Sequence, residues 1–175
     1  MARLLLSDRT KPGDVVLDVD DDVAFAATAA QMGRRHHALG GERYLASMSH
    51  AAGYIDLMLL HWPRPAVNPH RLLRACQPLF GSTGCLVVAV SAGADHRLAH
   101  LSALASAGTA VGLRTVQHVV VLAPDAATSA ATAEPSGGQR GRREAGPLAR
   151  GHGVGEVRAP HTDLLIFQLG AADDE

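Results

Sequence analysis

Residues 11–22 read KPGDVVLDVDDD, which places a turn, a short apolar run and an acidic cluster in direct succession. The segment 11–14 is rich in turn residues, and the β-branched run at 15–19 is short enough for a strand buried on both faces. The aspartates at 20–22 can then accept hydrogen bonds from the first backbone N–H groups of a helix, expected at 23–34. A strand followed directly by a helix predicts an α/β protein.

The same alternation of short and long segments continues to residue 123. Short apolar runs predict further strands, and the stretches between them predict helices. Arg34 is expected in the last turn of the helix at 23–34, where a positive charge suits the negative helix end. The further strands are expected at 36–39, 54–60, 85–90 and 116–122, and the further helices at 42–52, after the capping residue Asn68, and from the capping residue Asp95 to Gly112.

Proline and glycine predict two connections between these elements. A loop is expected at 61–65, where two prolines follow the strand at 54–60, because a residue before proline avoids the helical conformation. The segment Gly81-Ser82-Thr83-Gly84 is expected to be a turn that leads into the strand at 85–90.

The composition changes at residue 124. From 124 to 160 the chain consists mainly of alanine, threonine, serine, glycine, proline and arginine, which cannot form a core. We predict a flexible excursion there, a closing strand of the same domain at 161–169 and an acidic tail at 170–175. The two strands that flank the excursion are expected to pair as an antiparallel hairpin at one edge of the sheet.

The overall composition is that of one ordinary soluble domain. The chain has 175 residues, a net charge of −1 and 47% hydrophobic residues, so no overall field favours nucleic acid or anionic lipid. Cys76 and Cys85 form neither a disulfide framework nor a metal motif, and we expect buried thiols in a cytoplasmic protein. The leucine run at 4–6 is shorter than the roughly seven apolar residues of a signal peptide. No run approaches the roughly twenty residues of a membrane helix.

The order of these segments resembles the class I S-adenosylmethionine-dependent methyltransferases, and among them the DNA and RNA amino-methyltransferases. The segments that carry the resemblance are 11–18, 56–60, 72–76, 84–88 and 161–167. The resemblance implies a Rossmann-like sheet, mostly parallel with a C-terminal antiparallel strand, with helices on both faces and the cofactor at the carboxyl ends of the strands. The sheet is expected to be reduced, because only one helix fits between residues 39 and 54.

The cofactor motif of this family is an acidic residue followed by glycines at alternate positions. Asp18 matches the acidic position, whereas Asp20, Asp22 and Ala24 stand where the glycines belong. The resemblance implies that Asp18, Asp20 and Asp22 border S-adenosylmethionine. Two like charges about 4 Å apart repel by about 4 kcal/mol at an effective dielectric constant near 20, which is about a thousandfold in affinity. These carboxylates therefore oppose the cofactor's own carboxylate unless a cation or a different loop path compensates.

Glu42 is the candidate for the acidic residue that holds the cofactor's ribose in this family. It stands three positions after Leu39, the end of the expected second strand. A carboxylate at the start of a helix is also stabilised by the helix dipole, so an equally good reading gives Glu42 a capping role. The sequence leaves both readings open.

The catalytic motif of the amino-methyltransferases is a short polar residue, two prolines and an aromatic residue after the fourth strand. In this sequence His61, Trp62 and Pro63 occupy that place, and only Pro63 matches outright. His61 takes the polar position, and Trp62 could stack on an extruded base. The alternative is a loop histidine beside a tryptophan that seals the edge of the sheet.

Other patterns in the sequence carry weaker alternatives. Asp18 and Asp20 also resemble the first motif of the haloacid dehalogenase-like phosphatases, but that family needs a later lysine, and Lys11 is the only lysine. His96 and His100 are four residues apart without the glutamate of zinc proteases, so no metal site is predicted. The arginines at 140–150 are nearly balanced by acidic residues, which is typical of a solvated loop.

Together these patterns predict an S-adenosylmethionine-dependent methyltransferase-like protein with a nucleic-acid or protein partner. Its cofactor and catalytic motifs are degenerate. The alternative is a non-catalytic protein of the same fold that acts as a protein-binding module. An open cleft above Asp18 and His61 would favour the methyltransferase. A cleft filled by the protein's own side chains would favour the binding module.

Overall fold

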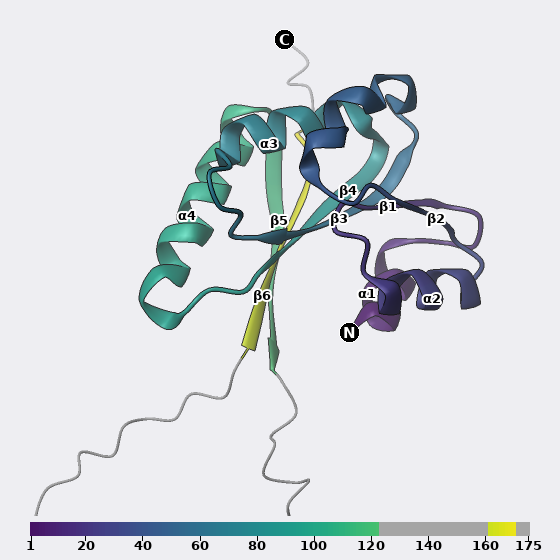
Figure 1. Ribbon diagram of the computed structural model, residues 1–175, viewed down its shortest axis with the longest axis horizontal. Helices are drawn as coiled ribbons and strands as arrows, with labels where there is room; N and C mark the ends of the chain where they lie inside the picture. Colours follow the sequence, from purple (N-terminus) through teal and green to yellow (C-terminus); the bar gives the residue numbers. More distant parts are fainter. Residues whose placement is uncertain (123–160, 171–175) are drawn as a thin grey trace, which may run out of the picture. The chain divides into compact units, whose positions relative to one another are not determined.

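The computed structural model describes residues 1–122 and 161–170, which form a six-stranded sheet with helices on both faces (Figure 1). The strands are β1 (Val15–Asp18), β2 (Arg35–Ala38), β3 (Ile55–Trp62), β4 (Phe80–Val90), β5 (Leu113–Leu122) and β6 (His161–Leu169). The α-helices are α1 (Ala2–Arg9), α2 (Val23–Gln31), α3 (Pro69–Cys76) and α4 (Ala94–Ala110), and the 3₁₀ helices are η1 (Glu42–Ala51) and η2 (Gln77–Leu79).

The order of the strands across the sheet is β2-β1-β3-β4-β6-β5. The pairs β1–β2, β1–β3 and β3–β4 are parallel, and β6 runs antiparallel to β4. The predicted fold class is therefore confirmed, including the C-terminal antiparallel strand and its place next to β5. The strands β2 and β3 pair with β1 on opposite sides. The order of the strands thus reverses at the carboxyl ends of β1 and β3, which is the place where α/β proteins bind ligands.

Successive side chains of the central strands feed two separate cores, because they point to opposite faces of the sheet. One core holds Leu73 of α3, Leu86 of β4 and Leu104 of α4. The other core holds Leu6 of α1 and Phe25 of α2, which pack with alternate residues of β4 and β6. The helices α1 and α2 thus cover one face, and η1, α3 and α4 cover the other.

The helix α1 was not predicted from the sequence. Its Leu6 is fully buried, and the Thr10 hydroxyl donates a 2.6 Å hydrogen bond to the Leu6 carbonyl at the end of the helix. Arg34, expected inside the helix at 23–34, lies beyond the end of α2 at Gln31. Its guanidinium instead donates to the carbonyls of Thr10 and Met32, both at 2.6 Å, and joins the ends of α1 and α2.

The boundaries of β3 and β4 correct two predictions. The expected loop at 61–65 begins later, since β3 continues through Trp62. The expected turn at 81–84 lies inside β4, opposite a register irregularity between Ile55 and Leu57. A Cβ atom on Gly84 would lie 2.5 Å from the Ile55 carbonyl oxygen, so this glycine allows two strands to approach closely rather than turning the chain.

Two helices are capped as the sequence predicts, the start of one differs, and one helix differs in type. Asp22 and Asn68 cap α2 and α3 through their side chains, as predicted. The residue before α4 is Gly93, and Asp95 lies within the first turn instead of capping it. The segment expected as an ordinary helix at 42–52 is the 3₁₀ helix η1, and it is the only element between β2 and β3 in the described residues, so the predicted reduction of the sheet is confirmed.

Cys76 and Cys85 are buried thiols, as predicted. Burial raises the pKa of Cys76 to about 12 and that of Cys85 to about 11. None of the helices in the described part of the chain is long and apolar enough to cross a membrane. The predicted excursion at 124–160 and the acidic residues at 171–175 lie outside the described residues.

Candidate functional site

The loop after β1 is folded around the carboxylate of Asp18. Asp18 is 2% exposed, and its two oxygens accept hydrogen bonds from the backbone N–H groups of Asp20 (3.0 Å), Asp21 (3.1 Å) and Asp22 (2.7 Å). Asp21 has a φ of +61°, a left-handed conformation that aspartate adopts more readily than most residues. Both oxygens of Asp18 thus accept hydrogen bonds from the backbone of its own loop. The residue that matches the family's acidic position therefore holds the loop in its conformation.

Asp22 starts the helix α2 with its side chain. Its Oδ1 atom accepts hydrogen bonds from the backbone N–H groups of Ala24 (2.8 Å) and Phe25 (3.2 Å). A capping carboxylate satisfies N–H groups that have no partner inside the helix and interacts favourably with the helix dipole. The structure therefore gives Asp22 the capping role that the acidic cluster predicts.

Asp20 joins the loop after β1 to the end of β3. Its Oδ2 atom accepts a 2.6 Å hydrogen bond from the backbone N–H of His61 and lies 3.1 Å from His61 Nδ1. Its Oδ1 atom accepts a hydrogen bond from the guanidinium of Arg64. The carboxylate is consequently held from two directions by groups at and just beyond the carboxyl end of β3.

These contacts shift the pKa values of both partners. Burial raises the pKa of Asp20, but the side-chain and backbone hydrogen bonds from His61 and the charge of Arg64 outweigh it, so the pKa lies below its ordinary value. The hydrogen bond to Asp20 raises the pKa of His61. Burial partly opposes that rise, and the charges of Asp20, Asp18 and Asp22 add to it. The pair therefore favours a charged imidazolium beside a charged carboxylate.

Arg64 also holds Glu42, the ribose candidate. Its Nη1 atom donates a 2.6 Å hydrogen bond to Glu42 Oε2, and its Nε atom donates a 3.0 Å hydrogen bond to the His61 carbonyl. The Arg64 side chain is only 12% exposed. The guanidinium of Arg64, which follows β3, thus bridges Asp20, which follows β1, and Glu42, which follows β2. We refer to Asp20, Arg64 and Glu42 as the arginine bridge.

The sequence alone did not identify Arg64. The aspartates need a compensating cation, and Arg64 follows Trp62 and Pro63 directly after β3. The carboxyl ends of neighbouring parallel strands meet at one edge of the sheet, so the position of Arg64, four residues after Leu60, was the signal that pointed to it.

Of the three residues matched to the catalytic motif, only His61 has its side chain beside Asp20 and Arg64. Trp62 is 5% exposed, and its Nε1 atom donates a 3.2 Å hydrogen bond to His100 Nδ1 on α4. The His61 side chain is 53% exposed, because successive residues of a strand point to opposite faces. Of the three residues matched to the catalytic motif, His61 borders the arginine bridge, Trp62 packs into the core and Pro63 begins the following segment.

The space above Asp18 and His61 is narrow. A cavity of about 40 Å³ lies there, and Met1 and Leu5 of α1 and Phe25 of α2 form part of its wall. Sites that bind small molecules and cofactors usually measure about 300–1,000 Å³. In the part of the chain that the structure describes, no three His, Cys, Asp or Glu side chains are placed to hold a metal ion. S-adenosylmethionine does not fit the residues and the space found at this position.

No protein-family model matches the sequence, and no curated protein matches it. The structure aligns with geranyl diphosphate C-methyltransferase from Streptomyces coelicolor A3(2), solved with Mg²⁺, geranyl diphosphate and S-adenosyl-L-homocysteine. The alignment has 12% identity and a TM-score of 0.55, and it covers 96% of this chain and 78% of the enzyme. The antibiotic-resistance methyltransferase Kmr aligns at 13% identity with a TM-score of 0.50, covering 98% of this chain and 94% of Kmr.

The chain has the fold of the class I S-adenosylmethionine-dependent methyltransferases. A structure of geranyl diphosphate methyltransferase with S-adenosylmethionine aligns at 11% identity with a TM-score of 0.53, covering 96% of this chain and 84% of that enzyme. At such identities the likeness concerns the methyltransferase fold alone. The roles of Asp18, Asp20, Glu42 and His61 must therefore be argued from their own contacts.

Proposed function

We propose that this chain is a non-catalytic protein of the methyltransferase fold that acts by binding a partner protein. The observation that carries the proposal is the arginine bridge. By the resemblance, Asp20 matches a glycine position of the cofactor loop, and Glu42 is the candidate for the residue that holds the ribose. Arg64 holds both carboxylates, so a cofactor would have to displace a guanidinium that is 12% exposed.

The size of the cavity supports the same proposal. The space of about 40 Å³ above Asp18 and His61 would have to grow to several hundred Å³ to admit a cofactor. That growth requires the movement of α1, whose Met1 and Leu5 line the space, or of α2, whose Phe25 lines it. The end of α1 is fixed by hydrogen bonds from Arg34 to Thr10, so the movement would also break contacts that join α1 to α2.

The sheet offers a surface for such a partner at β5. This strand is the last in the order of the sheet, with β6 as its one neighbour among the described strands. Val120 and Leu122 are 50% and 68% exposed along it. An edge strand that exposes apolar side chains can accept an extended segment of another protein.

The first test of this proposal is calorimetric titration of the purified protein with S-adenosylmethionine and S-adenosylhomocysteine, with and without Mg²⁺. We expect no binding by the native protein. The variant Asp20→Gly, Asp22→Gly removes one partner of the arginine bridge and restores the glycines of the family, so we expect it to gain measurable binding. Asp21→Gly is the matched control, because it changes the same loop but leaves Asp20 and Arg64 in contact. Micromolar binding by the native protein would overturn the proposal.

The second candidate function is an active S-adenosylmethionine-dependent methyltransferase that acts on amino groups of nucleic acid. It is favoured by the position of His61 at the carboxyl end of β3, where its exposed ring adjoins the crevice. The same titration separates the two candidates. Binding by the native protein would lead to methyl-transfer assays on DNA and RNA, with His61→Ala as the variant expected to lose activity.

A further inference from the structure

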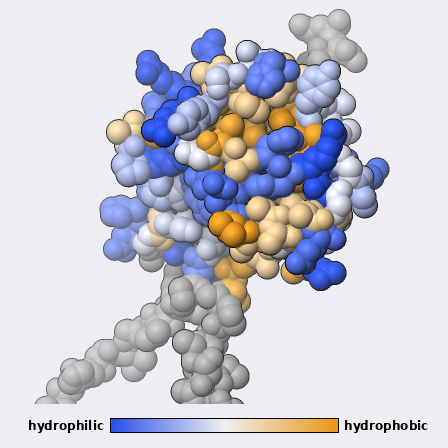
Figure 2. Space-filling model, turned by 45° about the vertical axis from the view of Figure 1, so that its right-hand side comes forward, coloured by the Kyte–Doolittle hydropathy of each residue, from blue (hydrophilic) through white to orange (hydrophobic). Residues whose placement is uncertain are grey.

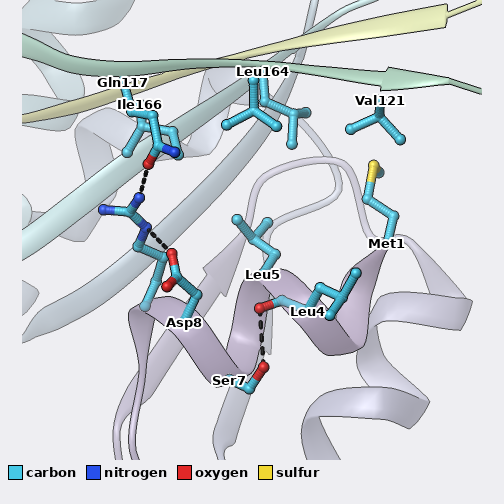
Figure 3. Close-up of a pocket in the computed structure, with 11 residues that line it drawn as sticks. Met1, Leu4, Leu5, Ser7, Asp8, Gln117, Val121, Leu164 and Ile166 are labelled. Carbon is cyan, nitrogen blue, oxygen red and sulfur yellow. Dashed lines mark hydrogen bonds and ion pairs between the residues drawn. The ribbon is translucent and has the colours of Figure 1, made fainter.

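A second hollow lies on the face of the sheet that α1 covers. The helix α1 and the strands β5 and β6 enclose a groove of about 600 Å³ (Figure 3). This volume falls within the range of about 300–1,000 Å³ that is usual for small-molecule sites. The walls of the groove are mostly apolar and come from Leu4, Leu5, Val119, Val121, Leu164 and Ile166.

The groove has one polar end and one apolar end. Figure 3 shows Gln117 and Asp8 at one end, and Met1 and Val121 at the other. At the polar end the guanidinium of Arg9 donates a hydrogen bond to Gln117 Oε1. Its Nε atom lies 2.8 Å from an Asp8 oxygen but has no hydrogen-bond partner. An arginine is charged at every physiological pH, so this end carries a permanent cation.

The surroundings of Arg9 direct this charge toward the groove. The Arg9 side chain is 19% exposed, whereas its ion-pair partner Asp8 is 67% exposed. Solvent and salt screen the charge of an exposed carboxylate strongly and that of a largely buried guanidinium much less. An anion that enters the groove would therefore meet the guanidinium in low-dielectric surroundings.

We propose that this groove binds an amphipathic anion, a molecule with an alkyl chain and a carboxylate or phosphate head. The chain lies along the apolar walls between α1 and β6, and the head accepts hydrogen bonds from Arg9. Leu4 is 76% exposed and Met1 is 58% exposed, so apolar surface at the groove is left in water without a ligand. Apolar patches separated by hydrophilic side chains are visible on the face drawn in Figure 2. The proposal is independent of the closed cleft, because it needs no S-adenosylmethionine.

The binding test is calorimetric titration of the full chain with dodecanoate and with dodecyl phosphate, below their micelle-forming concentrations. Dodecanol and dodecyltrimethylammonium carry the same chain with a neutral and a cationic head. We expect saturable binding of at least one anion, with at least tenfold weaker binding of the other two head groups. The ratio of the two anion affinities tells whether the head is a carboxylate or a phosphate. Equal binding of all heads, or binding of none, would overturn the proposal.

Two pairs of variants locate the ligand. Arg9→Gln should weaken anion binding at least tenfold and leave dodecanol unaffected, whereas the exposed Arg3→Gln on the same helix should change neither. Val121→Trp should fill the groove and abolish binding, and Val120→Trp should leave it intact because adjacent strand residues face opposite sides. Circular dichroism confirms that each variant is folded before titration. Equal effects within either pair would contradict the assignment of the groove.

Light scattering adds a check on a different occupant. If a second copy of the chain covers the groove, the native protein will be a dimer and dodecanoate will dissociate it, while Val121→Trp will be monomeric without ligand. That pattern would replace the small-molecule proposal with a self-association site. A native protein that binds dodecanoate without a change in mass supports the amphipathic anion.

Discussion

The Asp20 carboxylate accepts a 2.6 Å hydrogen bond from the backbone N–H of His61, a residue 41 positions later in the chain. This contact and the Arg64 ion pair tie the loop after β1 to the carboxyl end of β3. In the methyltransferase fold the crevice opens between these two strands. The aspartate that replaces a glycine thus fastens the two sides of the crevice together.

Removal of Arg64 should destabilise the protein. Arg64→Ala leaves Asp20 and Glu42 without their shared cation, and hydrogen bonds to charged groups contribute about 1.5–3 kcal/mol each before the partial exposure of both carboxylates is taken into account. We expect the free energy of unfolding to fall by about 1–3 kcal/mol, measured in urea at neutral pH. Arg71→Ala, on the exposed side of α3, is the control and should change it by less than about 0.5 kcal/mol.

The pair Asp20–His61 should make stability depend on pH in a defined window. The folded-state pKa of Asp20 lies below 3.8, so its contribution is present above that value and is lost as pH falls through the lowered pKa. The folded-state pKa of His61 lies above 6.5, so its contribution is present below 6.5 and is lost as pH rises through the raised pKa. The pair therefore stabilises most between about pH 4 and pH 6.5.

The variant His61→Gln tests this window. It keeps the backbone hydrogen bond to Asp20 but removes the titrating ring. We expect the difference in unfolding free energy between native protein and variant to be larger near pH 5.5 than near pH 8.5, with both pH values chosen about one unit or more from the ordinary pKa of histidine. A difference that is the same at both values would show that the ring does not pair with Asp20.

Asp163 should be the most sensitive charged position of β6. It is 2% exposed, and it lies 2.7 Å from His118 Nε2 and 3.3 Å from Arg97 Nε. Removing one partner of a buried ion pair costs about 3–5 kcal/mol, because the other charge stays buried and unpaired. Asp163→Leu should approach that loss in urea denaturation. Arg97→Met in the same chain should recover part of it, and no recovery would mean that Arg97 is not the main partner.

Gly84 should not tolerate a side chain. A Cβ atom there would lie 2.5 Å from the Ile55 carbonyl oxygen, which belongs to the backbone of the neighbouring strand and cannot rotate away. We expect Gly84→Ala to reduce the unfolding free energy by about 1–3 kcal/mol. Gly93→Ala is the control, since nothing lies within 4 Å of the added atom and the φ of Gly93 is −57°. Equal effects of the two substitutions would contradict the close approach of β3 and β4.

The fold was largely predictable because short apolar runs mark the strands and their spacing marks the crossovers. The helix α1, before Lys11, was not predictable. Its three leucines are consecutive, so they show no periodicity that distinguishes a helix from a loop. The strand β3 is also two residues longer at its carboxyl end than predicted, which changes the interpretation of the site. Once β3 continues through Trp62, the alternation of a strand turns that ring into the core, although the proline pattern had predicted a loop.

The candidate site was predictable as a place but not as a set of contacts. The sequence located Asp18, Asp20 and His61 at the carboxyl ends of neighbouring strands, where the structure finds them. It could not show that Arg64 reaches back to Asp20 and Glu42, because a long side chain can point in several directions and its choice depends on the loop path in space. The contacts of Arg64 with Asp20 and Glu42 could therefore be seen only in the structure.

The two outer strands of the described sheet differ in the side chains that they expose. The edge strand β2 has the sequence RHHA, with a charged and two titratable side chains, whereas β5 exposes Val120 beyond its polar residues Gln117 and His118. Charged and polar residues on an edge discourage further strand pairing, and apolar ones permit it. A second sheet that pairs with β5 would use up that edge, and the polar side chains of β2 would oppose pairing at the other. A pairing that is limited to one edge would close as a two-fold dimer instead of extending into an open fibre.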